Sequence, residues 1–288
     1  MRRLDGEHVN TMHISTMHMN RTGEDAVHVS VRGVRLHVVE EGAGPPVLLV
    51  HGLGGNARLW DAQLADLGRT YRVLAVDQRG FGASDRTYGE MELSDWADDL
   101  AGLLQALDLG PTVVVGHSMG GMVAQELAVR APELLAGLIV ASTMPGASAR
   151  HVEINNSLAE LALREGSGPF SAALVGGCFT PATIAAGERC VTELERAVAA
   201  TDPLVLAIAL RAVTRFDVRA ALPLVAVPTH VIVGAQDALL EDSREIARLI
   251  PGAGLTVMAD TAHCPNLERS AEFSRIVGGF LSDRPRWS

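Results

Sequence analysis

The stretch Thr112-Val-Val-Val-Gly-His-Ser-Met-Gly-Gly-Met122 decides the fold of this chain. A β-branched run ends at Gly116, Ser118 follows between small residues, and a helical pattern begins at once. A serine on such a sharp strand-to-helix turn has a strained backbone. Side chains two residues before or after it would collide, so glycine is favoured at both places. The stretch therefore predicts that the Ser118 hydroxyl stands exposed above a sheet.

Strand and helix patterns alternate on both sides of this turn. Short apolar runs, typical of strands buried on both faces of a parallel sheet, occur at 47–50, 73–76, 113–115, 138–140, 230–233 and 255–258. Helical patterns separate them at 58–67, 95–107, 119–129, 242–249 and 268–281. Before them, 27–31 and 34–39 alternate apolar and polar residues and predict an antiparallel hairpin at the sheet edge. Ser94 is the expected N-cap of the second helix. We predict an α/β fold whose mostly parallel sheet carries helices on both faces.

The alternation is interrupted once. Residues 147–225 contain helical segments separated by prolines and no clear strand. This favours an α/β core made of 25–146 and 226–288, with 147–225 as a helical cap over the carboxyl ends of the strands. Residues 1–24 are polar and without a period, and their histidines match no metal motif, so we expect a loose leader and no metal site.

Composition excludes several classes of function. The 288-residue chain has a net charge of −10 and no dense basic patch, which argues against nucleic-acid binding. It contains no lysine, so Schiff-base and lysine-dependent chemistry are excluded. No apolar run is long enough for a membrane span, and no signal peptide is evident. The three cysteines, Cys178, Cys190 and Cys264, lack paired spacing, which favours free thiols and a cytoplasmic location.

A serine hydroxyl needs a base, and the base needs an orienting acid. In an open α/β sheet these groups lie just past the carboxyl ends of strands, so we searched those positions. His263 follows the last predicted strand, and Asp237 follows the strand before it. The order Ser118, Asp237, His263 favours a catalytic triad over ordinary loop residues. Asp242, which begins a helix, and Asp260, which is close in sequence to His263, are weaker candidates for the acid.

Two backbone amides are expected to stabilise the oxyanion. Met119 follows the nucleophile, and Leu53 lies in the glycine-rich turn His51-Gly-Leu-Gly-Gly55. That turn lacks the lysine of a phosphate-binding loop, so nucleotide binding is disfavoured. We interpret His51 and His117 as structural. The loop Asp77–Asp85 is interpreted as scaffolding, and Cys264 as incidental to catalysis.

These motifs together resemble the α/β-hydrolase superfamily over residues 27–282. The matching segments are His51-Gly-Leu-Gly, Asp77-Gln-Arg-Gly-Phe-Gly-Ala-Ser-Asp85, Gly116-His-Ser-Met-Gly-Gly121, Gly234-Ala-Gln-Asp237 and Ala262-His263. Within it, the chain is similar to the 3-oxoadipate enol-lactonase branch and its esterase relatives. The segments that carry this closer likeness are Leu59-Trp60-Asp61, Ser118-Met-Gly-Gly-Met-Val-Ala-Gln125 and Phe179-Thr180-Pro181.

The resemblance implies a cap over the active site and no cofactor. An enol-lactone that carries carboxylates would favour an arginine in this cap. Arg211 and Arg215, one helical turn apart, are the first candidates, and Phe179 is a further candidate substrate contact. The other arginines of the cap that would serve are Arg150, Arg164 and Arg189. Few aromatic residues and many aliphatic ones predict an aliphatic pocket, which also suits a more hydrophobic ester or lactone.

The expected function is therefore hydrolysis of a small carboxylic ester or lactone through an acyl-enzyme. Serine at position 118 argues against epoxide and halide chemistry, which would need a carboxylate there. Several other enzymes use the same triad and stay open: a hydrolase, thioesterase or cyclase of a biosynthetic pathway, a cofactor-free perhydrolase and a carbon–carbon hydrolase. So does a non-enzymatic receptor that retains the triad.

Overall fold

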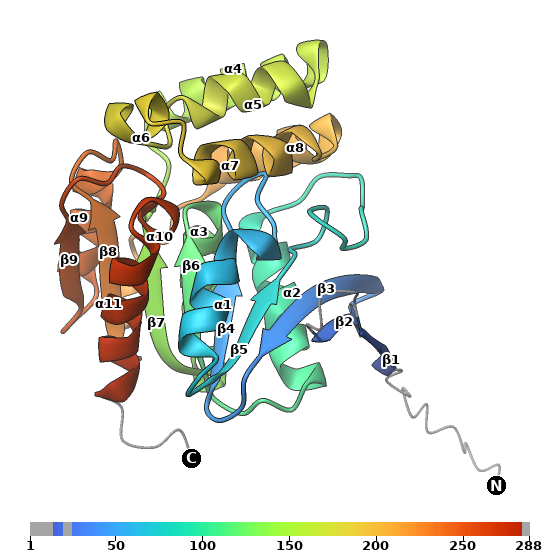
Figure 1. The fold of residues 1–288 in the computed structure, drawn as a ribbon, viewed down its shortest axis with the longest axis vertical. Coiled ribbons are helices and arrows are strands. Elements are labelled where there is room, and N and C mark those ends of the chain that lie inside the picture. The colour runs from blue at the N-terminus through green and yellow to red at the C-terminus, as the bar shows by residue number, and fades with distance from the viewer. Residues whose placement is uncertain (1–13, 20–24, 284–288) are drawn as a thin grey trace, which may run out of the picture.

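The computed structural model describes residues 14–19 and 25–283 (Figure 1). They form a 9-stranded sheet in the order β1-β2-β3-β5-β4-β6-β7-β8-β9. The strands are β1 (Ile14–Met19), β2 (Asp25–Val31), β3 (Val34–Glu41), β4 (Pro46–Val50), β5 (Arg72–Val76), β6 (Thr112–His117), β7 (Leu135–Ala141), β8 (Thr229–Gly234) and β9 (Gly254–Met258). From β5 to β9 all neighbours pair in parallel, which confirms the mostly parallel sheet.

Helices cover both faces of this sheet (Figure 1). Those of the core are α1 (Asp61–Leu67), α2 (Leu93–Ala106), α3 (Met119–Arg130), α9 (Leu240–Leu249), α10 (Pro265–Glu268) and α11 (Ser270–Ser282), with the short 3-10 helices η1 (Ala57–Trp60) and η2 (Pro132–Leu134). Along β6, Val114 packs into the apolar cluster that contains α2 and α3, while Val113 and Val115 pack into the cluster that contains α1 and α11. The strand is therefore apolar throughout because both of its faces are buried.

The N-terminal hairpin forms as predicted, since β2 pairs antiparallel with β3. Residues 14–19 differ from the expected loose leader, because they form β1 and extend the sheet by pairing antiparallel with β2. An edge strand offers free backbone groups to any segment that can become extended, whatever its side-chain pattern. The rest of the expected leader, residues 1–13 and 20–24, lies outside the described residues.

The start of α2 differs from the prediction. Its N-cap is Glu92, and Glu92 and Asp95 accept hydrogen bonds from each other's backbone N–H in a capping box. Ser94 lies inside the first turn. The N-cap position is settled by which side chain meets a free N–H, and a serine near the start of a helical pattern does not determine this.

The insert, which we define as residues 147–225, lies between β7 and β8. It contains α4 (Ala149–Glu165), α5 (Ser167–Val175), α6 (Pro181–Ala185), α7 (Arg189–Ala199), α8 (Pro203–Arg215) and the short 3-10 helix η3 (Leu222–Leu224). Figure 1 shows these helices together at the top, beyond the carboxyl ends of the central strands. That they form a separate cap domain stays a prediction. Among the described residues, no single helix has the length and apolarity of a membrane span, and α7 with α8 passes only as a pair bent by 99°.

Candidate active site

Ser118 occupies the strained turn that the sequence predicts. Its φ of 53° and ψ of −118° lie outside the regions that residues with side chains favour. A Cβ on Gly116 would lie 2.3 Å from the carbonyl oxygen of Gly120, and one on Gly120 would lie 2.3 Å from that of Val50. The backbone N–H of Ser118 donates to Ala141 O at 2.9 Å. The turn is therefore held between two strands, and the residues two positions before and after Ser118 are glycines because no side chain fits there.

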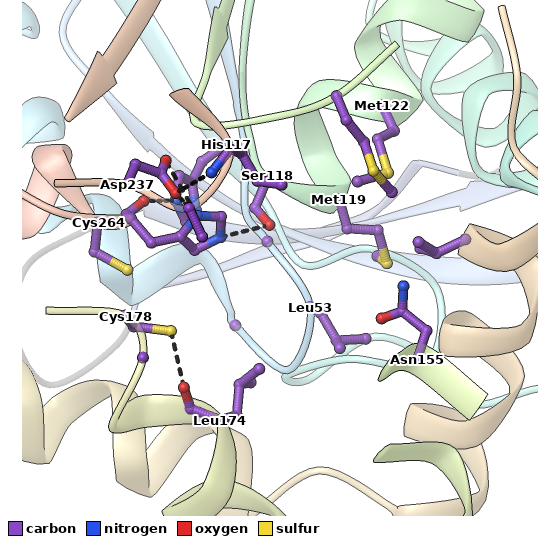
Figure 2. Close-up of a pocket in the computed structure, with 18 of the residues that line it drawn as sticks. Leu53, His117, Ser118, Met119, Met122, Asn155, Leu174, Cys178, Asp237 and Cys264 are labelled. Atoms are coloured by element: carbon purple, nitrogen blue, oxygen red, sulfur yellow. Dashed lines mark hydrogen bonds and ion pairs between the residues drawn. The ribbon is translucent and has the colours of Figure 1, made fainter. Parts of the chain in front are cut away.

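Ser118, His263 and Asp237 come together although they lie far apart in the sequence. His263 Nε2 lies 2.9 Å from Ser118 Oγ, and His263 Nδ1 lies 3.1 and 3.3 Å from the two carboxylate oxygens of Asp237. Asp237 follows β8 and His263 follows β9, so each stands past the carboxyl end of its strand. Figure 2 shows Ser118 and Asp237 on the same side of the pocket. Of the competing acids, Asp260 is exposed, and Asp242 lies 4.0 Å from His151 instead.

Asp237 and His263 shift each other's pKa. Burial raises the pKa of Asp237, but the positive charge and hydrogen bond of His263 outweigh it and lower the pKa to about 2. Burial lowers the pKa of His263, but the charge and hydrogen bond of Asp237 outweigh it and raise the pKa to about 9. Such opposed shifts are typical of a carboxylate that holds and stabilises a protonated imidazole.

His117 and His51 stabilise the backbone around the site, in agreement with their interpretation as structural residues. His117 Nε2–H donates to the carbonyl oxygen of His263 at 2.7 Å, and burial lowers the pKa of His117 to about 3, so its ring is neutral. His51 Nδ1–H donates to Gly52 O at 2.7 Å, while Nε2 accepts from Gln78 N–H at 3.0 Å. Both rings thus fix the backbone around the site.

The loop Asp77–Asp85 is scaffolding, as its composition indicates. The Asp77 carboxylate accepts backbone N–H groups from Ala57 at 2.6 Å and Ala83 at 2.8 Å. Two further ion pairs tie the loop to the core: Arg79 with Asp99 at 2.6 Å and Arg35 with Asp85 at 2.9 Å. The charged side chains of this loop therefore form ion pairs and hydrogen bonds within the protein.

A cavity of about 820 Å³ extends from Ser118 and His263 to the insert. Leu53 and Met119, the predicted oxyanion residues, both line it. The loop that carries Leu53 approaches the nucleophile closely, because a Cβ on Gly52 would lie 3.1 Å from Ser118 Cβ. The walls are mainly aliphatic or thioether side chains, among them Met122, Met144, Leu158, Leu194 and Leu210. The prediction of an aliphatic pocket is confirmed.

The structure does not place the predicted substrate contacts of the insert at the cavity. Arg211 and Arg215 are exposed and do not line the cavity, and Arg215 pairs with Glu92 at 2.6 Å. Phe179 is 4% exposed and packs in the apolar core. Helical spacing on α8 placed both arginines on one face, but it did not reveal that other residues of this helix, Leu210 and Val213, line the cavity instead. The insert arginine that lines the cavity is Arg150, at the first turn of α4.

Sequence reasoning missed two groups of polar residues. His151 and Asn155 of α4 line the cavity together with Arg150 and Asp242. The buried Glu268 carboxylate accepts from Thr180 N–H at 2.8 Å and Ala262 N–H at 2.6 Å, and so joins the insert to the loop before His263. A carboxylate five residues after His263 was the available signal. Within 14–19 and 25–283, we find no group of three His, Cys, Asp or Glu residues that would hold a metal ion.

Comparison with known proteins shows the family to which this chain belongs. The family model for the alpha/beta hydrolase fold matches residues 45–270. RutD of Pseudomonas syringae pv. syringae (strain B728a), which is named as a carbamate hydrolase, is 30% identical over 256 residues that cover 86% of this chain and 98% of RutD. The 3-oxoadipate enol-lactonase 2 of Acinetobacter baylyi (strain ATCC 33305 / BD413 / ADP1) is 29% identical over 81% of this chain and 87% of its own.

Solved structures give the same result. A thermophilic esterase from Thermogutta terrifontis is similar with a TM-score of 0.83 and 31% identity, over 90% of this chain and 98% of that chain. An enol-lactonase from Burkholderia xenovorans LB400 is similar with a TM-score of 0.84 and 27% identity, over 88% of this chain and 99% of that chain. Because the family model spans most of the sequence, and these relatives match along nearly their whole length, the chain belongs to the alpha/beta hydrolase fold family.

Proposed function

We propose that this protein is a serine hydrolase that cleaves a small carboxylic ester or lactone. The proposal rests on the contacts that connect Asp237, His263 and Ser118 at the wall of the cavity. Asp237 Oδ1 lies 3.1 Å from His263 Nδ1, and His263 Nε2 lies 2.9 Å from Ser118 Oγ. These distances suit proton transfer from a nucleophile to a base. The relatives named as esterase and enol-lactonase support this reaction type.

The reaction proceeds in two halves. Ser118 Oγ attacks the carbonyl carbon while its proton passes to His263 Nε2, and Asp237 stabilises the imidazolium that forms. His263 then gives the proton to the leaving oxygen, the carbon–oxygen bond breaks, and an acyl-enzyme remains. Water, activated by the same imidazole, attacks the acyl group and releases the acid and the free Ser118 hydroxyl.

The developing oxyanion would be held by two backbone N–H groups, those of Leu53 and Met119. Met119 is the first residue of α3, where the N–H groups have no partner within the helix and the helix dipole favours negative charge. Leu53 reaches the site because the glycine turn lies against Ser118. Both donors belong to rigid backbone, so they need no reorganisation during the reaction.

The cavity favours an aliphatic substrate. Its volume of about 820 Å³ and its Met and Leu walls suit an acyl chain of several carbons. Polar groups at the α4 side of the cavity, namely Arg150, His151 and Asn155, would contact a polar substituent. A dicarboxylated enol-lactone is a weaker fit, because Arg150 is exposed and replaces the arginines expected on α8.

Release of p-nitrophenol from p-nitrophenyl butanoate tests the proposal. Ser118→Ala removes the nucleophile and should lower kcat by about 10³-fold or more, with an unchanged circular dichroism spectrum. Ser157→Ala, which changes an exposed serine on α4 outside the cavity, is the matched control and should turn over at the wild-type rate. A fluorophosphonate should label the peptide that contains Ser118.

Turnover by Ser118→Ala at the wild-type rate would contradict the proposal. Failure of the fluorophosphonate to label Ser118, together with ligand binding without turnover, would favour the receptor alternative. A panel of lactones, thioesters, carbamates and carbon–carbon substrates separates the remaining enzyme classes. Carbamates belong in it because the RutD relative is named for that substrate class.

A further inference from the structure

Two of the three cysteines meet at the wall of the cavity. Cys178 lies between α5 and α6 in the insert, and Cys264 directly follows His263 in the core. Both are buried, both carry free thiols and both line the cavity. The third cysteine, Cys190 on α7, lies outside the residues that form the cavity wall. The chain therefore holds a thiol pair beside the catalytic base and a third thiol for comparison.

Backbone geometry brings the pair within bonding reach. The N–H of Cys264 donates to the carbonyl oxygen of Cys178 at 3.1 Å. A hydrogen bond of this length holds the two Cα atoms within about 7 Å of each other, given standard backbone dimensions. Disulfides span Cα separations up to about 6.8 Å, so a bridge needs only a small backbone movement. Figure 2 shows the two side chains close together beneath Asp237.

The two thiols also influence each other's ionisation. The Cys178 thiol donates to Leu174 O at 3.3 Å. Interaction with the neighbouring Cys264 thiol lowers the pKa of Cys178 despite its burial, and the charge of His263 adds to this effect. The same interaction, together with burial, raises the pKa of Cys264. Cys178 is therefore the more reactive thiol, and Cys264 is the neutral partner beside it.

We propose that Cys178 and Cys264 are an oxidisable thiol pair, which a hydroperoxide converts to a disulfide that joins the insert to the loop carrying His263. The Cys178 thiolate attacks one peroxide oxygen, the O–O bond breaks, and water or an alcohol leaves with the proton. The Cys264 thiol then attacks the Cys178 sulfenic acid, the S–S bond forms, and water leaves. Two thiols are oxidised by two electrons and the peroxide is reduced; a dithiol reverses the change.

Oxidation should also affect turnover. Forming the S–S bond draws Cys264 toward the insert, and Cys264 is joined to His263 through one peptide bond. His263 works only while Nε2 stays near Ser118 Oγ, a distance of 2.9 Å in the reduced protein. Small displacements of a catalytic group lower rates by about tenfold to a hundredfold. The disulfide would therefore inhibit turnover reversibly.

The test treats the full reduced chain with hydrogen peroxide. We expect the number of titratable thiols to fall from three to one, and peptide mapping to find Cys178 linked to Cys264. Ester turnover should fall about tenfold or more and return with dithiothreitol. Cys190→Ser, the matched control, should lose two thiols and the same share of turnover. In Cys264→Ser, dimedone should trap a sulfenic acid on Cys178.

Direct mapping in the wild-type chain keeps the test valid even if a variant fails to fold. Three titratable thiols after peroxide treatment, or oxidised thiols without the Cys178–Cys264 peptide, would overturn the pair. Equal peroxide inactivation of wild type and Cys178→Ser would show that other groups are responsible, and would contradict inhibition by the disulfide. A mapped disulfide with unchanged turnover would do the same. Because thiol counting and peptide mapping do not use hydrolysis, they test the thiol pair independently of the proposed function, whereas inhibition by the disulfide rests on that function.

Discussion

At the residue scale, the charge of Asp237 controls the protonation of His263. The ring can accept the serine proton only when Nε2 is unprotonated, yet the carboxylate raises the pKa of His263 to about 9. In the proposed reaction, the same carboxylate stabilises the imidazolium of the transition state. This one contact would therefore move the pH range of activity upward and lower the barrier within it.

We predict that kcat/KM for a neutral ester rises with pH, with a midpoint well above 6.5 and near 9. Asp237→Asn should lower kcat by about 10⁴-fold and move the midpoint down, because the charge that favours the imidazolium is gone. A pH–rate profile of both proteins measures this. An unchanged midpoint in Asp237→Asn would contradict the assigned acid.

The same shift affects stability with a defined sign. The folded-state pKa of His263 lies above its ordinary value of 6.5, so the pair stabilises the fold fully below pH 6.5 and loses this contribution as pH rises through about 9. Asp237 has a folded-state pKa of about 2, below its ordinary 3.8, so its contribution is present above pH 3.8 and is lost as pH falls through 2. Urea unfolding across pH should show both losses in wild type and neither in Asp237→Asn.

At the scale of elements, Glu268 fixes how the insert meets the core. This carboxylate, on the short helix α10, accepts three hydrogen bonds: two from the insert, at Thr180 N and Thr183 Oγ1, and one from Ala262 N. Ala262 immediately precedes His263. The contact that anchors α6 therefore also positions the loop of His263, the proposed catalytic base.

Glu268→Ala should destabilise the protein by about 3 kcal/mol or more, because three buried donors lose their acceptor. For a chain of this size, Tm should fall by roughly 5–10 °C. Thermal unfolding measures the loss. Glu165→Ala, which removes an exposed carboxylate at the end of α4, is the control and should change stability by about 0.5 kcal/mol or less. Equal Tm values for the two variants would show that Glu268 does not hold the junction.

Sequence patterns predicted which helices and strands exist more accurately than they predicted where each one begins and ends. The apolar runs of the central strands appear within one to three residues of their observed bounds, because burial on both faces leaves a continuous apolar signal. The start of α2 at Leu93 and the strand β1 were not found. A cap depends on one side-chain contact, and an edge strand on a backbone partner. Neither leaves a period in the sequence.

At the scale of the whole molecule, the cavity is shared between the insert and the core. Leu158 of α4 lines it and is half-buried, whereas Leu163 on the same helix is 44% exposed and lies outside the wall. We predict that Leu158→Trp lowers kcat/KM for p-nitrophenyl octanoate by roughly tenfold and leaves the acetate nearly unchanged, because the larger ring fills acyl-chain space. Leu163→Trp should change neither.

Steady-state kinetics with both esters measures this preference. An equal loss of kcat/KM for the acetate and the octanoate in Leu158→Trp would mean that the substitution disturbs catalysis itself and not the preference for acyl-chain length. Loss of octanoate turnover in Leu163→Trp would mean that the insert selects substrate by another route.

The sequence by itself determined the α/β fold and the residues of the proposed triad. Both follow from local constraints: glycines where Ser118 leaves no space, apolar runs where strands are buried, and polar residues just after strands. Tertiary structure alone decided what surrounds these residues. Arg150 enters the cavity while Arg211 does not, Glu268 holds the His263 loop, and Cys178 meets Cys264. These contacts depend on how α4 to α8 pack over the sheet, and packing between distant segments is not encoded in any local pattern.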